Sequence, residues 1–440
     1  MSQAEPTRIE PLPRPLCGSI RVPGDKSISH RAVLFSAMAQ GTSRVRGLLD
    51  STDVRASIGA VSALGAKVDL EKQPDGSLAG EIRGWGEEGP AQPQEPIDCA
   101  NSGTTARLLM GVLAPWPIRV TLTGDDSLRG RPMRRITAPL MKMGAQFEPA
   151  GSETLPITII GDRDLKAVSY ESPMASAQLK TAVLLAGLGA EGETMVTEPA
   201  ISRNHTELML PEYGATTTAG ERTASVEGPC TLQATEVLVP GDPSSAAFAV
   251  CAAMMKRGSQ IQVDNVSLNT ARIGFTRTLE RMGADIELIH KGSAGKEPYG
   301  SIHARYSDHL VGCEVPADKI ASVIDEIPVL ALVAAHAHGV TVFRDVAELK
   351  VKESNRLQAT KEGLLSLGVE CWTHGEDLFI QGDPDLHVPE GIVFDSRGDH
   401  RLAMTWALVG LCHNAGVEVT DFACTAVSFP DFLDTLQGAC

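Results

Sequence analysis

The sequence has few aromatic residues, no paired cysteine motif and no long hydrophobic run. Phe, Trp and Tyr make up only 4% of its 440 residues, which leaves few side chains on which nucleic-acid bases could stack. Nine cysteines are scattered singly between Cys17 and Cys440 without any Cys-x-x-Cys pair. That pattern favours reduced thiols, acting as small core residues, over a disulfide framework or a zinc site. We therefore expect no metal centre.

The apolar runs are rich in alanine and are broken by polar residues well short of a membrane-spanning length. The N-terminal stretch Met-Ser-Gln-Ala-Glu-Pro lacks the basic and then apolar pattern of a secretory signal. A net charge of −16, from 39 basic and 55 acidic residues, argues against nonspecific binding to nucleic acid. These absences predict a cytoplasmic protein with neither a membrane nor a nucleic acid as its partner.

A short phrase with a central glycine recurs along the chain. Each copy ends an amphipathic helical run and leads into a strand-like segment, such as residues 67–70. Glycine is the usual stop signal at a helix C-terminus, so each phrase predicts a helix, a stop and a strand. The five copies are Leu64-Gly65-Ala66, Met143-Gly144-Ala145, Tyr213-Gly214-Ala215, Met282-Gly283-Ala284 and Leu367-Gly368-Val369.

A second type of helix, rich in Ala and Leu and about a dozen residues long, recurs six times. The spacing between its starts is about 68 to 81 residues, close to one sixth of the chain. The copies are predicted to begin near Ser27, Ser102, Ser176, Ser244, Asp325 and Asp399. Six units of alternating helices and strands place the protein in the α/β class.

The repeat is divided into two halves. Val22-Pro23-Gly24-Asp25 returns as Val239-Pro240-Gly241-Asp242, half the chain later. We therefore predict two similar domains of three units each, residues 23–239 and residues 1–22 plus 240–440, hinged at two crossovers. A cleft between hinged domains is a usual ligand site.

The first helix start carries an unusual set of polar residues. Lys26, Ser27, Ser29 and Arg31 lie within six residues, at a helix N-terminus where backbone N–H groups and the helix dipole favour an anion. The equivalent start of the fourth unit, 243–246, is Pro-Ser-Ser-Ala, so the repeat itself does not require the cations. A phosphate or carboxylate site is one interpretation, and an ordinary capped helix with solvated cations is the other.

Other helix starts also carry polar residues that are confined to one copy. Arginine binds carboxylate and phosphate bidentately, and acids favour helix N-termini through the dipole alone. For each segment the alternative is a plain cap, a polar loop or a solvated ion-paired face. The segments are Asn101 to Arg107 with Gly103, Arg129 to Arg135 with Arg131, Ser176 to Lys180, Ser202 to His205, Asp325-Glu326, Lys350 to Arg356, and Gly398 to Arg401.

At these segments the sequence resembles the 5-enolpyruvylshikimate-3-phosphate synthase family, from about residue 17 to residue 437. Five motifs occur together and in order: Pro-Gly-Asp-Lys-Ser-Ile-Ser-His-Arg, Asn-Ser-Gly-Thr-Thr-Ala-Arg, Arg-Pro-Met, Lys-Glu-Ser-Asn-Arg and Asp-His-Arg. The resemblance implies two domains of three βαβαββ units each. It also implies transfer of the enolpyruvyl group of phosphoenolpyruvate to the 5-hydroxyl of shikimate 3-phosphate, with release of phosphate, without a cofactor and by a monomer.

The resemblance further implies residue roles. Asp325 would take the proton of the 5-hydroxyl, Glu353 would protonate the methylene carbon, and Lys26 would stabilise developing charge. Shikimate 3-phosphate would be held by Lys26, Ser27, Arg31, Ser176, Ala177, Gln178, Ser202, Arg203, Asp325 and Lys352. Phosphoenolpyruvate would be held by Lys26, Gly103, Arg131, Gln178, Arg356 and Arg401. Glyphosate inhibits members of this family at the phosphoenolpyruvate site, and Gly103 predicts room for it.

Two departures resemble the second class of the family. The lysine often found before the Ser/Thr-Phe-Pro segment near the C-terminus is replaced by Val427, and Ala177 lies between Ser176 and Gln178 where some members have serine.

Two other interpretations agree less well with the sequence. The sister transferase acting on UDP-N-acetylglucosamine has a Lys-Asn pair at the first helix and a cysteine acid in a mobile loop, but here Ser27 follows Lys26 and no cysteine is near Arg131. A non-catalytic anion-binding scaffold would explain the repeat but not charges confined to single copies.

Overall fold

The protein, seen in a computed structural model that describes residues 5–440, divides into two compact units. Unit 1 comprises residues 5–23, Pro240–Gly292 and Pro298–Cys440, and unit 2 comprises Gly24–Val239 and Ser293–Glu297. The chain passes from one unit to the other inside the two Val-Pro-Gly-Asp phrases, between Pro23 and Gly24 and between Val239 and Pro240, and again at both ends of the short segment Ser293–Glu297.

Unit 2 contains three copies of a βαβαββ unit, each with its own four-stranded sheet. In the second copy the strand order is β6-β7-β9-β8, with β6 parallel to β7 and the other neighbours antiparallel. Its elements are β6 (Ile97–Asp98), α3 (Gly103–Leu113), β7 (Arg119–Thr123), α4 (Asp126–Arg129), α5 (Arg134–Met143), β8 (Gln146–Glu148) and β9 (Ile157–Ile160).

The third copy repeats this order as β10-β11-β13-β12. Its elements are β10 (Ser169–Glu171), α6 (Ala177–Gly187), β11 (Gly192–Thr197), α7 (His205–Met209), η2 (Leu210–Tyr213), β12 (Thr217–Ala219) and β13 (Thr223–Gly228). The first copy has the order β14-β3-β5-β4. It is built from α1 (Lys26–Met38), β3 (Thr42–Leu48), α2 (Thr52–Ala63), β4 (Lys67–Lys72), β5 (Leu78–Arg83), η1 (Gly86–Glu88) and β14 (Glu236–Leu238).

Unit 1 holds the other three copies. The fourth has the order β16-β17-β15-β2, the fifth β18-β19-β21-β20, and the sixth is a three-stranded sheet β1-β23-β22. The fourth copy contains β2 (Cys17–Arg21), α8 (Pro243–Met255), β15 (Gln260–Ser267), α9 (Gly274–Arg281), β16 (Asp285–Ala294) and β17 (Glu297–Arg305). The fifth contains β18 (Glu314–Val315), α10 (Ala317–Ile320), α11 (Ile327–Ala334), β19 (Gly339–Phe343), η3 (Ala347–Val351), α12 (Arg356–Ser366), β20 (Cys371–His374) and β21 (Asp377–Gly382). The sixth contains β1 (Thr7–Ile9), β22 (Val393–Phe394), α13 (His400–Cys412), β23 (Val417–Val419), η4 (Phe422–Val427) and α14 (Phe432–Gln437).

The two leading strands are exchanged between sheets. Strand β2 precedes α1 in the sequence but pairs in parallel with β15. Strand β14 precedes α8 but pairs in parallel with β3. Each of these two sheets therefore includes a strand that is distant in the sequence: β2 comes before unit 2 and joins a sheet that follows it, and β14 from the end of unit 2 joins a sheet at its beginning.

The structure confirms the predicted starts of the recurring inner helices. Their N-caps are Asp25, Ser102, Ser176, Asp242, Glu326 and Asp399. Five of these residues accept a hydrogen bond from the first turn, as good caps do. The exception is Glu326, whose side chain makes no cap bond, and α11 has only eight residues instead of about a dozen.

The predicted helix stops are also confirmed. The five glycines have the left-handed backbone that glycine adopts at low cost, with φ of 97°, 117°, 83°, 87° and 81° at Gly65, Gly144, Gly214, Gly283 and Gly368. A strand follows each of them, starting at Lys67, Gln146, Thr217, Asp285 and Cys371.

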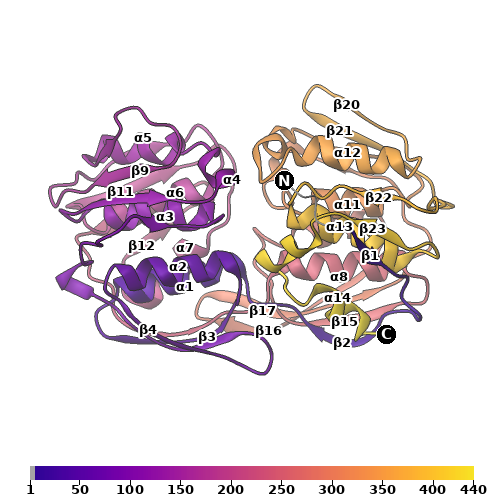
Figure 1. The fold of residues 1–440 in the computed structure, drawn as a ribbon, viewed down its shortest axis with the longest axis horizontal. Helices are drawn as coiled ribbons and strands as arrows, with labels where there is room; N and C mark the ends of the chain where they lie inside the picture. Colours follow the sequence, from indigo (N-terminus) through magenta and orange to yellow (C-terminus); the bar gives the residue numbers. More distant parts are fainter. Residues whose placement is uncertain (1–4) are drawn as a thin grey trace. The chain divides into compact units, whose positions relative to one another are not determined.

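Each unit has its own core around three inner helices that are buried nearly all round, namely α1, α3 and α6 in unit 2 and α8, α11 and α13 in unit 1. In Figure 1, α3 and α6 lie side by side above α1. Helices α3 and α6 are so close that a Cβ built on Gly111 would lie 2.2 Å from the carbonyl oxygen of Ala182. The inner helices therefore hold their N-termini in fixed positions within each unit.

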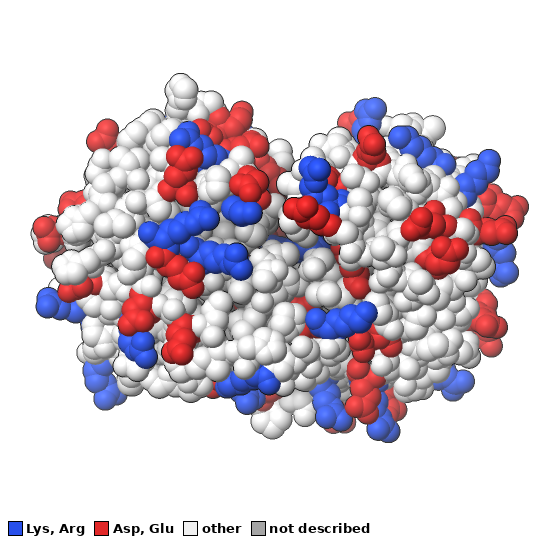
Figure 2. Space-filling view, turned by 180° about the vertical axis from the view of Figure 1, so that it is seen from behind, with Lys and Arg blue, Asp and Glu red and all other residues white. Residues whose placement is uncertain are grey.

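The surface mixes both signs of charge. Figure 2 shows Lys and Arg interspersed with Asp and Glu over the face turned away from the view of Figure 1. Over residues 5–440, no helix combines the length and the apolar character needed to cross a membrane. All nine cysteines are free thiols.

Candidate active site

The start of α1 is organised by two carboxylates. Asp25 accepts a hydrogen bond from the backbone N–H of Ile28 at 2.8 Å and thereby caps the helix. The Lys26 ammonium lies 2.5 Å from the Asp53 carboxylate in the first turn of α2. Lys26 keeps 20% of its side-chain surface exposed while Asp53 keeps 7%. The ion pair holds the lysine at the helix N-terminus with its ammonium still within reach of a ligand.

Arg31 is buried and bound to its own unit. Its guanidinium donates to the hydroxyls of Thr206 and Thr181, at 2.8 and 2.7 Å, and to the backbone carbonyl of Ser27 at 2.9 Å. Only 3% of Arg31 is exposed. Its main role in the structure is to join α1 to α6 and α7, so any contact with a ligand would be an additional one.

Ser176 and Ser202, two serines predicted to hold shikimate 3-phosphate, are both bound by one buried carboxylate. Glu198 accepts from the backbone N–H of Ser176 at 2.9 Å and from the hydroxyl of Ser202 at 2.8 Å. The Lys180 ammonium lies 2.8 Å from the same carboxylate and 2.7 Å from that of Glu207. The three charged residues of this group are all at most 6% exposed.

Gln178 is fixed by two arginines. Its carbonyl oxygen accepts from Arg107 and from Arg135, each at 2.9 Å, and its amide donates to the Thr104 hydroxyl at 3.0 Å. Gln178 remains partly exposed at the start of α6, next to Ala177. The start of α6 and the start of α3 are therefore linked through side chains.

Arg131 lies beside the start of α3. It donates to Asn101 at 2.6 Å and to the Ser127 hydroxyl at 3.2 Å. A Cβ built on Gly103 would lie 2.9 Å from the Arg107 Nη1 atom and 3.5 Å from that of Arg131. Both guanidinium groups therefore lie beside Gly103, and a side chain at this position would crowd that of Arg107.

Arg203 of unit 2 lies near Ser27. Its Nη1 atom is 3.5 Å from the Ser27 hydroxyl, which places the segment before α7 beside the first turn of α1. Unit 2 thus brings together Lys26, Ser27, Arg31, Gly103, Arg131, Ser176, Ala177, Gln178, Ser202 and Arg203 at or beside the N-termini of its inner helices.

Unit 1 has a corresponding cluster around Arg356. Its guanidinium donates to Asp399 at 2.8 Å, to Asp325 at 2.9 Å and to Glu353 at 2.6 Å. Only 1% of Arg356 is exposed, whereas Glu353 and Asp325 keep 31% and 13% of their side chains exposed. The interpretation of Glu353 and Arg356 as a solvated surface pair is wrong, because the arginine is buried under three carboxylates.

The charges of this cluster stabilise one another. Burial alone would lower the pKa of Arg356, but Asp399, Glu353 and Asp325 raise it above its usual value. Burial would raise the pKa of Asp399, and the Arg356 charge instead holds it below its usual range. Arg356 is therefore a fixed cation that keeps Asp399 ionised.

Two further cations lie beside Asp325. The Lys352 ammonium lies 3.7 Å from its carboxylate and 2.7 Å from that of Glu348. Arg401 donates to the backbone carbonyl of Asp325 and to the Glu326 carboxylate, each at 3.3 Å. Glu326 also accepts from Ser244 at the start of α8. These bonds explain why Glu326 does not cap α11, since its carboxylate is already bound elsewhere.

The structure thus gathers the predicted residues into one cluster in each unit. Sequence reasoning missed Asp53, Glu198 and Arg107 as the partners of predicted residues, and it gave Asp399 no specific role beyond a possible cap. Asp399 does accept from the N–H of Arg401, but it also binds Arg356. A buried acid at a strand end, such as Glu198, has no local signal in the sequence.

The architecture first defines a class. The fold matches that of the enolpyruvyl transferase NikO from Streptomyces tendae, so it belongs to the enolpyruvyl transferase class of architectures. The two structures superpose with a TM-score of 0.79 over 98% of this chain and 96% of the other, at 18% identity. At that identity the likeness concerns the fold alone.

The sequence then defines the family. The family model for EPSP synthase (3-phosphoshikimate 1-carboxyvinyltransferase) matches residues 12–436. The solved EPSP synthase from Acinetobacter baumannii is 38% identical, with a TM-score of 0.86 over 98% of this chain and 97% of the other. The chain belongs to the EPSP synthase family.

Curated relatives match along nearly their whole length. The 3-phosphoshikimate 1-carboxyvinyltransferase of Chelativorans sp. (strain BNC1) is 44% identical over 430 residues, which cover 96% of this chain and 94% of the relative. The protein of the same name from Nitrobacter winogradskyi is 46% identical over 428 residues, 96% of this chain and 95% of the relative.

Proposed function

We infer that this chain is a 3-phosphoshikimate 1-carboxyvinyltransferase. It transfers the enolpyruvyl group of phosphoenolpyruvate to the 5-hydroxyl of shikimate 3-phosphate and releases phosphate, a transferase step of aromatic biosynthesis. The observation that carries this inference is the family match over residues 12–436, which includes both candidate clusters. The scaffold and the UDP-N-acetylglucosamine alternatives do not account for that match.

In the proposed mechanism, unit 1 supplies the acid and the base. Addition across the enol ether needs a base at the attacking hydroxyl and an acid at the methylene carbon. Arg356 holds Asp325 and Glu353 on the same guanidinium, through two different nitrogen atoms. Asp325 takes the hydroxyl proton and Glu353, the more exposed of the two, delivers a proton to the carbon. The guanidinium fixes the separation between acid and base.

The anionic groups of the substrates are bound by hydroxyls and cations. In unit 2, Ser176, Ser202 and Gln178 offer donors that are already oriented by Glu198, Arg107 and Arg135. Lys26 and Arg131 add positive charge beside the helix starts, which stabilises charge that develops in the reaction. For shikimate 3-phosphate the proposed residues are Lys26, Ser27, Arg31, Ser176, Ala177, Gln178, Ser202, Arg203, Asp325 and Lys352. For phosphoenolpyruvate they are Lys26, Gly103, Arg131, Gln178, Arg356 and Arg401.

The decisive test is an assay of phosphate release. Purified protein is incubated with phosphoenolpyruvate, with and without shikimate 3-phosphate, and inorganic phosphate is measured over time. We expect release only when both substrates are present, and mass spectrometry should detect the enolpyruvyl product. Release with UDP-N-acetylglucosamine as the acceptor, or no release with either acceptor, would contradict the assignment.

The finer properties belong to the same proposal. We propose that the enzyme acts in the cytoplasm as a monomer without a cofactor or metal, and that it binds no nucleic acid. We also propose residues 23–239 and residues 1–22 plus 240–440 as its two domains. Glyphosate is expected to inhibit it in competition with phosphoenolpyruvate, because Gly103 leaves room beside Arg107 and Arg131. Inhibition kinetics at varied phosphoenolpyruvate test that point directly.

A further inference from the structure

The two units differ at the C-terminal ends of their inner helices, away from the candidate clusters. In unit 1 these ends are occupied by basic side chains. His336, after α11, and His413, after α13, lie with their Nε2 atoms 2.8 Å apart. Their Nδ1 atoms contact the carbonyls of Leu332 and Val409 in the last turns of the same helices, at 2.8 and 2.9 Å.

The third helix end of unit 1 carries an ammonium. Lys256 is the C-cap of α8 and donates to the backbone carbonyl of Leu12 at 3.1 Å. A helix C-terminus has a negative partial charge and favours a cation or a hydrogen-bond donor. In unit 1, histidine side chains therefore contact the last turns of α11 and α13, and the residue after α8 is a lysine.

Unit 2 has apolar residues at the equivalent positions. Ala39 is the C-cap of α1 and Leu188 that of α6, while Pro115 follows the C-cap of α3. In place of the basic side chains there is a cavity of about 260 Å³. The cavity is lined from all three helix ends, by Met38, Pro115 and Trp116, and Leu185, Leu188 and Gly189.

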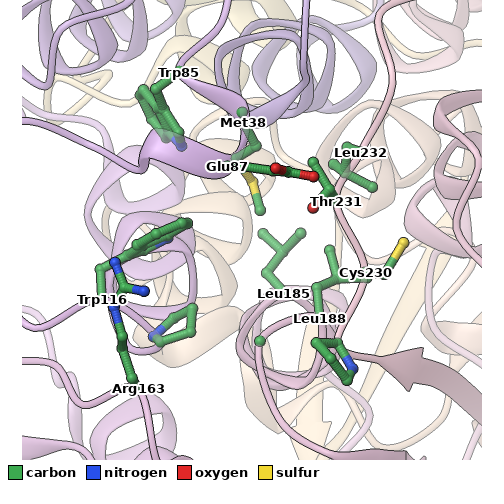
Figure 3. A pocket seen from close by; sticks show the side chains of 14 residues that line it. Met38, Trp85, Glu87, Trp116, Arg163, Leu185, Leu188, Cys230, Thr231 and Leu232 are labelled. Carbon is green, nitrogen blue, oxygen red and sulfur yellow. The ribbon is translucent and has the colours of Figure 1, made fainter.

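The walls of this cavity are apolar and its rim is charged (Figure 3). Trp116 and Arg163 form one side, with the guanidinium 5.6 Å from the centre of the indole ring. Cys230, Thr231 and Leu232 form the opposite side. The Glu87 carboxylate extends towards Thr231. Neither Arg163 nor Glu87 forms an ion pair with any residue in the described part of the chain, and both are exposed.

Backbone hydrogen bonds fix two loops of the wall. The backbone N–H groups of Trp85 and Cys230 donate to the carbonyls of Ala37 and Leu188, at 2.9 and 2.8 Å, and so fix the two loops to the ends of α1 and α6. A cavity of this size is slightly below the range of about 300–1,000 Å³ for drug-sized ligands. The occupant must therefore be small.

We propose that this cavity binds a small zwitterion with a flat apolar side chain, of the type of an aromatic α-amino acid. Its ammonium group pairs with the Glu87 carboxylate, because the last carbonyls of the inner helices already accept from backbone N–H groups, as those of Ala37, Ala114 and Leu188 do. Its carboxylate pairs with Arg163 at the rim. Its ring packs against Trp116, where aromatic pairs gain energy beyond the area they bury. The proposal does not depend on the catalytic assignment.

The test is calorimetric titration of the full chain with L-phenylalanine. We expect saturable binding at millimolar or lower concentration, about the affinity of a small ligand with two charged contacts. Phenethylamine, which lacks the carboxylate, and 3-phenylpropionate, which lacks the ammonium, should each bind at least about fivefold more weakly. Binding should persist at saturating shikimate 3-phosphate, because the cavity is at the opposite helix ends from the candidate cluster of unit 2.

Matched variants locate the binding. Glu87→Gln and Arg163→Gln should each weaken L-phenylalanine about fivefold or more, which is roughly the effect of one charged contact. Glu88→Gln, the next residue in the same turn, and Arg222→Gln, an exposed arginine of the same unit that donates to Pro199, should leave it unchanged. Thermal melting checks that all four variants are folded.

Several outcomes would overturn the proposal. One is the absence of saturable binding of L-phenylalanine, L-tyrosine or L-tryptophan up to about 10 mM. A second is binding of L-phenylalanine that neither Glu87→Gln nor Arg163→Gln weakens. A third is an affinity for 3-phenylpropionate equal to that for L-phenylalanine. Displacement of L-phenylalanine by shikimate 3-phosphate would assign the ligand to the substrate site instead.

Discussion

Glu198 gives the sharpest prediction, because one buried carboxylate positions two serines of the proposed phosphate site. It accepts from the Ser176 N–H at 2.9 Å and from the Ser202 hydroxyl at 2.8 Å, and Lys180 balances its charge at 2.8 Å. Glu198→Gln keeps the shape of the side chain but replaces one acceptor oxygen by an NH₂ group. That group cannot accept from a serine and also faces the Lys180 ammonium.

The magnitude follows from the bonds that are lost. A hydrogen bond to a charged group contributes about 1.5–3 kcal/mol, and about 1.4 kcal/mol corresponds to a factor of ten. If one serine loses its orientation, the KM for shikimate 3-phosphate should rise about ten- to a hundredfold. The kcat should fall much less, because neither serine is placed at the carbon that is transferred. Steady-state kinetics with shikimate 3-phosphate as the varied substrate measure both constants.

Glu207→Gln is the matched control. Glu207 binds the same ammonium at 2.7 Å and is equally buried, but no bond joins it to Ser176 or Ser202 among the described residues. We expect it to lower the melting temperature without changing this KM. Equal increases of KM in Glu198→Gln and Glu207→Gln would show that only the charge balance around Lys180 matters, and the positioning argument would then be refuted.

Three further predictions concern other groups of the protein. Asp325→Asn and Glu353→Gln should each lower kcat by about a hundredfold or more, the usual contribution of a positioned acid or base. Both variants should still bind shikimate 3-phosphate in a calorimetric titration. Near-normal turnover in either variant would contradict the catalytic role proposed for that residue. Gly103→Ala places a Cβ 2.9 Å from the Arg107 guanidinium. The overpacking costs about 1–3 kcal/mol and should raise the inhibition constant of glyphosate more than the KM for phosphoenolpyruvate. Equal increases of the two constants would contradict the steric argument. Burial lowers the pKa of His336 to about 4, so below about pH 6.5 the unfolded chain takes up a proton that the folded chain does not. The free energy of unfolding should therefore fall by up to about 3 kcal/mol between pH 6.5 and 4. Denaturant titrations should show a shallower pH dependence of this free energy for His336→Gln, and an unchanged slope would exclude this residue as the cause.

Local signals in the sequence were enough to predict the repeat, the inner-helix starts and the helix stops. Caps such as Ser102 and Ser176 act within three residues, and a glycine such as Gly65 ends a helix through its own backbone angles. The family resemblance rests on motifs of the same short range. These signals could not predict the length of α11, because the Glu326 carboxylate does not cap the helix but is bound by residues of two other copies.

The tertiary structure decided which protein groups the predicted residues bind in addition to any substrate. Arg31 and Arg356 were both assigned to substrates on the basis of their motifs, yet each is buried and bound by side chains from other copies of the repeat. Glu198 acquires its role only because folding brings the end of β11 against the start of α6. The contrast between the His336 pair and the cavity of unit 2 likewise exists only in three dimensions. The physical reason is range: caps and stops act within one helical turn, whereas buried ion pairs join residues that are distant in the sequence and meet only when the inner helices pack.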